Sequence, residues 1–103
     1  MTSQINVQIT RLETRVLEID ERINALKRMA QDYSYQLRYE SSQLQSCVRS
    51  NPDTADVSCE ANYDSVNETK AALDDIATSL EILAQQKKLI LAELRSIRQA
   101  EPN

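Results

Sequence analysis

Hydrophobic residues recur at spacings of three and four through the first half of the chain. Apolar side chains that repeat about every 3.5 residues lie along one narrow stripe of a helix, and this stripe is buried against another helix. The pattern predicts a long helix over residues 3–48. This first seam, with its a and d heptad positions, consists of Ile5, Ile9, Leu12, Val16, Ile19, Ile23, Leu26, Ala30, Tyr33, Leu37, Glu40, Leu44 and Cys47.

A second helix is predicted over residues 55–100, after a turn at residues 49–54. Pro52 removes a backbone donor and disfavours helical geometry at Asn51, so the first helix must end there. Asp53 or Thr54 is expected to cap the second helix with its side chain. The second seam again alternates three and four and consists of Cys59, Asn62, Val66, Thr69, Leu73, Ile76, Leu80, Leu83, Lys87, Ile90, Leu94, Ile97 and Glu101.

The two seams match when the chain folds back at Pro52. Residues whose numbers sum to 106 then face each other, and a positions meet d positions as antiparallel helices require. The sequence therefore predicts an all-α fold over residues 1–103, with two long helices in a single antiparallel coiled-coil hairpin domain. Thr69, Glu40 and Asn62 interrupt apolar layers, so we expect the half near the turn to be the weaker one. Lys87 is expected to cover the seam with its stem while its ammonium reaches solvent.

Cys47 and Cys59 are the only cysteines, and the register places them in one layer at the turn. This favours a disulfide that closes a short loop. The alternative is a pair of reduced, buried thiols. With no histidine in the chain, two thiols cannot complete a tetrahedral zinc shell. We therefore expect no metal site.

All four aromatic residues are tyrosines in the half of the chain near the turn. Tyr33 is a seam residue, whereas Tyr35 and Tyr39 are expected to point outward with Arg38 between them. Tyrosine and arginine are enriched at interface hot spots. Tyr35, Arg38, Tyr39 and Tyr63 are therefore a candidate surface for a protein partner, and tyrosine rings packed along the helix surface are the alternative.

Several apolar residues of the second helix lie outside its seam. A lone two-helix hairpin needs only one apolar stripe, whereas a broader apolar surface is typical of helices with further neighbours. We expect two hairpins to associate into a four-helix bundle; scattered surface leucines are the alternative. The candidate interface residues are Ala77, Ile82, Ala84, Leu89 and Leu91.

Composition speaks against several classes of function. The chain has no glycine and no histidine, and it carries a net charge of −4 with acidic and basic residues interspersed. It lacks a glycine-rich phosphate loop and a nucleophile motif, and a two-helix hairpin offers no deep pocket. No stretch is apolar enough to span a bilayer, and no basic face suits nucleic acid. We expect neither enzymatic activity, nor a cofactor, nor membrane insertion.

These observations predict a non-enzymatic interaction or assembly module: an adaptor, a scaffold or a small secretion or assembly chaperone. It would act as a homo-oligomer and bind another protein by helix-face packing. One alternative is an exported or virion-associated structural module. The order of heptads, cysteine-bounded loop and heptads resembles that of viral fusion subunits, although tryptophan, glycine and a fusion segment are missing. The other alternative is a small helical regulator that binds nucleic acid. Free thiols would indicate the cytoplasm, and a native disulfide an extracytoplasmic or virion location.

Overall fold

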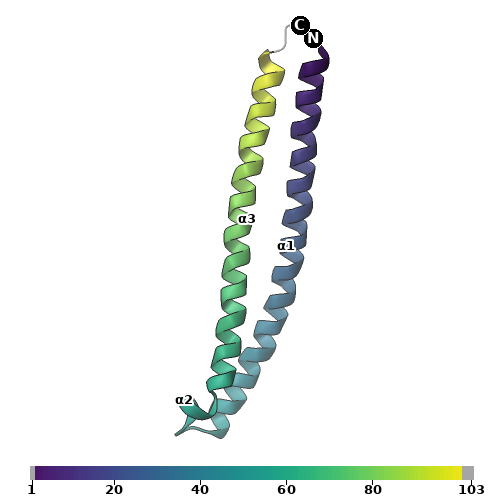
Figure 1. Cartoon of the computed structure of the whole chain (residues 1–103). Coiled ribbons are helices and arrows are strands. Elements are labelled where there is room, and N and C mark those ends of the chain that lie inside the picture. Colours follow the sequence, from purple (N-terminus) through teal and green to yellow (C-terminus); the bar gives the residue numbers. More distant parts are fainter. Residues whose placement is uncertain (1, 101–103) are drawn as a thin grey trace. The chain divides into compact units, whose positions relative to one another are not determined.

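The computed structural model describes the main chain of residues 2–100 and the side chains of residues 4–100. It contains α1 (Thr2–Ser50), α2 (Ala55–Ser58) and α3 (Glu60–Ala100), as Figure 1 shows. The chain divides into two units. The terminal unit comprises residues 1–26 and 79–103, and the turn unit comprises residues 27–78. The predicted antiparallel helical hairpin is confirmed, and its description as a single domain remains a prediction.

The burial pattern follows the two seams. From Ile5 to Cys47 and from Cys59 to Ile97, every seam residue is buried or half-buried, and most residues between them are exposed. Glu101, the last predicted seam residue, lies outside the described residues. The heptad assignment of both helices is therefore confirmed.

The terminal unit pairs the first half of α1 with the second half of α3. Ile19 and Leu94 are its buried hydrophobic residues. The Lys87 ammonium, which the sequence places in the seam, donates to Asp20 Oδ1 over 2.7 Å. A looser pair joins Arg98 to Glu13 at 3.8 Å. Lys87 thus reaches the surface of the unit, as expected from its long stem, and there it meets a carboxylate that the seam pattern did not indicate.

The turn unit contains the end of α1, all of α2 and the beginning of α3. Its buried residues are Cys59, Val66, Thr69 and Ile76. The helices are joined by a hydrogen bond from Gln36 to Thr69 and by the sulfur atoms of Cys47 and Cys59. This unit therefore has its own buried layer and its own covalent connection.

The first helix ends two residues later than predicted, at Ser50. Asn51 explains the difference, because its backbone N–H donates to the carbonyl oxygens of Cys47 (3.0 Å) and Val48 (3.2 Å). Its side-chain Nδ2 also donates to the Cys47 carbonyl, at 2.9 Å. Two of the last four carbonyl groups of α1, those of Cys47 and Val48, thus have a partner in the residue that precedes Pro52.

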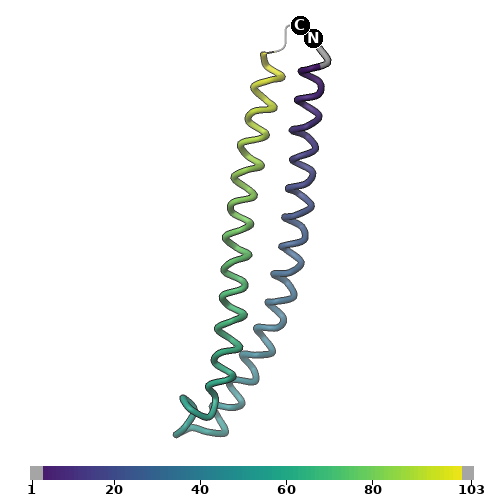
Figure 2. Tube along the Cα trace, in the orientation of Figure 1, coloured from purple at the N-terminus to yellow at the C-terminus, as the bar shows by residue number. Residues whose placement is uncertain are grey.

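The second predicted helix is interrupted. Thr54 does occupy the N-cap of α2, but its hydroxyl lies 2.9 Å from that of Ser58 and does not cap the helix. At Cys59 the backbone has φ −109° and ψ 15°, away from helical geometry, and the tube in Figure 2 changes direction between α2 and α3. The prediction of one continuous helix from residue 55 is wrong here. The break falls at the residue that is bonded to Cys47, and no glycine or proline marks it.

Two leucines of α3 provide a matched test of the seam. Leu94 is 4% exposed and Leu89 is 70% exposed. We expect Leu94→Ala to lower the free energy of unfolding by about 2–4 kcal/mol, because it leaves a cavity between the helices. Leu89→Ala should change it by less than about 0.5 kcal/mol. Urea unfolding, monitored by circular dichroism at one protein concentration, measures the unfolding free energy of both variants. Equal losses in the two variants would contradict the seam assignment.

Candidate functional site

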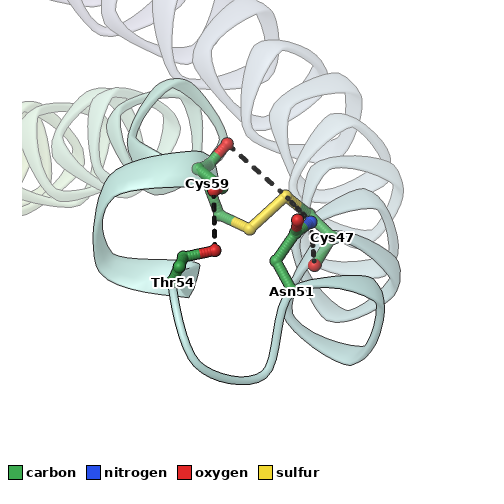
Figure 3. The surroundings of a disulfide bond; sticks show 5 residues. Cys47, Asn51, Thr54 and Cys59 are labelled. Carbon is green, nitrogen blue, oxygen red and sulfur yellow. Dashed lines mark hydrogen bonds between the residues drawn. A yellow bond between two sulfur atoms is a disulfide. The ribbon is translucent and has the colours of Figure 1, made fainter.

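The turn is closed by the two cysteines, as their shared layer predicted. The sulfur atoms of Cys47 and Cys59 lie 2.13 Å apart and the Cα atoms 5.9 Å apart, as in a disulfide bond (Figure 3). Cys59 is fully buried and Cys47 is half-buried. The two positions are only twelve apart in sequence, so the bond holds α2 against the end of α1.

The polar groups around the disulfide belong mainly to the backbone. The Ser58 carbonyl oxygen lies 3.8 Å from Cys47 Sγ, and Asn51 Nδ2 lies at the same distance from that sulfur (Figure 3). A disulfide sulfur carries no proton, so the approach to Ser58 is a van der Waals contact; a Cys47 thiol could donate there. The Thr54 carbonyl accepts the backbone N–H groups of Val57 (3.0 Å) and Ser58 (2.8 Å). The turn is thus held by local hydrogen bonds together with one covalent bond.

A polar layer lies within the apolar seam of the turn unit. Thr69 is 3% exposed. Its hydroxyl donates to Glu40 Oε1 and accepts a 3.3 Å hydrogen bond from Gln36 Nε2. A buried hydroxyl without a partner would be costly, whereas this one both donates and accepts. Thr69 and Glu40, two of the three polar residues that interrupt the seam, therefore form a hydrogen-bond network with Gln36 between α1 and α3.

This polar layer adjoins a groove of about 340 Å³ between α1 and α3. Its lining combines three amides, two hydroxyls and one carboxylate, and Tyr39 is the only aromatic residue there. Such a surface can donate hydrogen bonds to and accept them from a polar segment of another chain, and the Tyr39 ring offers apolar contact area. The lining residues are Gln36, Tyr39, Glu40, Gln43, Asn62 and Ser65.

The four residues of the predicted partner surface do not come together at one place. The Arg38 guanidinium carbon lies 5.9 Å from the centre of the Tyr35 ring, within the range of a cation–π contact. Tyr39 is 67% exposed and lines the groove. Tyr63 is an e position of α3, on the other side of the seam from Ser65, which is a g position in the groove. Tyr63 therefore does not share a face with Tyr35, Arg38 and Tyr39.

The five residues of the predicted oligomer interface are all exposed, but they divide between two faces of α3. Ile82 and Leu89 occupy c positions, beside the g positions of the heptad. The other three occupy e positions, across the seam, with Ala84 and Leu91 in the terminal unit and Ala77 in the turn unit. One partner helix cannot cover both faces at once.

Sequence reasoning missed Gln36, Gln43 and Ser65 as groove residues. All three occupy g positions, and the signal for them was the run of Glu40, Asn62 and Thr69 within the seam. Polar seam residues indicate that the flanking positions supply hydrogen-bond partners, because a buried polar group is costly without one. The flanking amides could therefore have been identified from their heptad positions.

Neither a metal centre nor a membrane-spanning segment was found in the part of the chain that the structure describes. Among these residues, no three side chains of the metal-ligating types are placed to share an ion. No helix there has a stretch apolar enough to cross a bilayer. Comparison with known proteins gave no match to a family model, to a curated protein or to a solved structure.

The polar layer makes a testable prediction for Thr69. Thr69→Val keeps the shape of the side chain but leaves the Glu40 carboxylate without its donor, so we expect a loss of about 1–3 kcal/mol in unfolding free energy. Thr69→Ser, which keeps the hydroxyl, should lose less. The double variant Glu40→Leu/Thr69→Val should recover stability, because both polar partners are gone. If Thr69→Val is more stable than the parent in urea unfolding, the network does not hold the layer together.

Proposed function

We propose that this protein is a non-enzymatic interaction module that self-associates through helix faces outside its seam. The observation that carries the proposal is the small amount of apolar surface that one chain buries. Among the described residues only five hydrophobic side chains are buried, while ten large ones remain at least 40% exposed. The seam residues themselves are mostly half-buried. Further helices would cover this surface, as in a four-helix bundle.

The distribution of charge supports a protein partner over nucleic acid. The terminal unit contains seven acidic and seven basic residues, and the turn unit contains nine acidic and five basic ones. Nucleic-acid-binding domains carry a basic patch that neutralises phosphates. Here the whole net charge of −4 belongs to the turn unit, so neither unit offers an excess of positive charge.

The surface of Tyr35, Arg38 and Tyr39 is proposed to bind a different protein. Tyr35 and Tyr39 are among the most exposed large side chains, and Tyr39 adjoins the polar groove of the turn unit. An aromatic ring beside hydrogen-bonding groups is typical of interface centres. This surface belongs to the turn unit, whose negative charge opposes contact between two copies.

Self-association is tested by light scattering coupled to size exclusion over a range of concentrations. We expect a molar mass near twice the 11.7 kDa of one chain. A mass of one chain at every concentration would refute the proposed function. Tyr35→Ala/Tyr39→Ala should leave the dimer mass unchanged, because we assign these tyrosines to another partner. In a pull-down, the immobilised double variant should fail to capture the proteins that the immobilised parent captures.

The disulfide supports a second candidate function, an exported or virion-associated structural module. Disulfides persist in oxidising compartments and are rare in the cytosol. Mass spectrometry of protein isolated from its native compartment, with free thiols alkylated during lysis, distinguishes the two. An unalkylated Cys47–Cys59 pair would support export. Alkylation of both residues would exclude this candidate and leave the intracellular adaptor.

A further inference from the structure

The e side of the terminal unit differs from its other faces because two ion pairs frame an exposed apolar patch. Lys87 pairs with Asp20 and Arg98 pairs with Glu13. Leu17 lies on α1 between the two acids, and Leu91 lies on α3 between the two bases. The exposed fractions of Leu17 and Leu91 are 64% and 43%. An apolar centre within a charged rim is the arrangement of a protein interface.

Charges on this side are divided between the two helices. Its acids, Glu13 and Asp20, belong to α1, and Glu21 lies beside them. Its bases belong to α3, where Lys88 and Arg95 are exposed and have no ion-pair partner within residues 4–100. Apart from Glu81, which occupies the b position of α3 nearest the turn unit, one helix thus presents negative charge and the other positive charge. A second copy of the same surface is electrostatically complementary if α1 of one copy meets α3 of the other.

Only one orientation of a symmetric pair satisfies this condition. A two-fold axis perpendicular to the helices would set α1 on α1 and oppose like charges. A two-fold axis parallel to the helices sets α1 of each copy on α3 of the other. Residues whose numbers sum to about 106 share a height along the helices, so Glu13 then meets Arg95 of the second copy, and Glu21 meets its Lys88. Every helix also gains an antiparallel neighbour.

The opposite face of the terminal unit is less complementary to a second copy of itself. Ile82 and Leu89 are exposed there, and Ile82 borders a groove of about 220 Å³ with Arg22. The g positions of α1 on this face include Arg15 and Arg22, and the only acid at the g positions of α3 is Glu93. In two copies of this face Arg15 would meet Glu93, but Arg22 would have no acid at the facing g positions, and Arg11 and Glu18 at the c positions of α1 cancel each other.

We propose that the e side of the terminal unit is the homodimer interface, centred on Leu17 and Leu91, with α1 of one chain packed on α3 of the other around a two-fold axis parallel to the helices. This inference rests on the proposed self-association and specifies its surface and orientation. It retains Ala84 and Leu91 from the sequence-based interface. Ile82 and Leu89 lie outside the dimer contact.

Charge reversal on one helix at a time tests the interface. Glu13→Lys/Glu21→Lys and Lys88→Glu/Arg95→Glu should each raise the dimer Kd about 10-fold or more, because like charges then face each other. An equimolar mixture of these two variants should form a heterodimer near parental affinity, since both contacts regain opposite charges. Sedimentation equilibrium gives the affinities, and circular dichroism confirms that each variant is folded.

The matched control is Ile82→Glu/Leu89→Glu, which places two charges on the opposite face and should dimerise as the parent does. If the parent and the charge-reversed variants are dimeric while the control variant is monomeric, the proposed interface is wrong, although the protein still self-associates. If each charge-reversed variant alone dimerises more weakly than the parent and mixing the two does not restore the affinity, the proposed orientation of the two chains is wrong. A monomeric parent removes the proposed function itself.

Discussion

The structure depends on the burial of two heptad seams against each other. A helix of this composition gains its stability from tertiary contacts and not from its own hydrogen bonds, because nucleation is costly and the exposed faces are polar. In the terminal unit the seam closes around Ile19 and Leu94, and in the turn unit around Val66 and Ile76. Each fully buried large side chain contributes about 1.5–3 kcal/mol, so the many half-buried ones contribute less. A single seam therefore leaves room for stabilisation by a second chain.

The two units stabilise their helix pairing by different means. Ion pairs flank the apolar layers of the terminal unit, with Lys87 and Asp20 at 2.7 Å. The turn unit instead has a disulfide between Cys47 and Cys59 and a buried hydrogen-bond layer around Thr69. A covalent link over a short loop restricts the unfolded chain, and a satisfied polar layer favours one register over its neighbours. These devices suit a unit whose acidic excess opposes a close approach by a second copy.

Sequence reasoning was sufficient for features that follow from periodicity. The helix pairing, the register and the meeting of Cys47 with Cys59 all follow from residue numbers that sum to 106. It failed at Cys59, where the helix breaks although the residue keeps its seam position and no glycine or proline marks the site. It also misjudged Thr69, because seam patterns score a hydroxyl as a gap and do not reveal that a carboxylate reaches it. Tyr63 was grouped with Tyr39 because both lie in the half of the chain near the turn, although their heptad positions belong to different faces.

The register of the two seams within one chain is the central claim, and methyl–methyl nuclear Overhauser contacts test it most directly. A methyl-labelled chain diluted into excess unlabelled chain reports only contacts within a single molecule. The account predicts contacts between Leu12 and Leu94 and between Val16 and Ile90, whose numbers both sum to 106. Contacts of Val16 with Leu83 or Ile97 in their place, or the loss of all contacts between the helices on dilution, would contradict it.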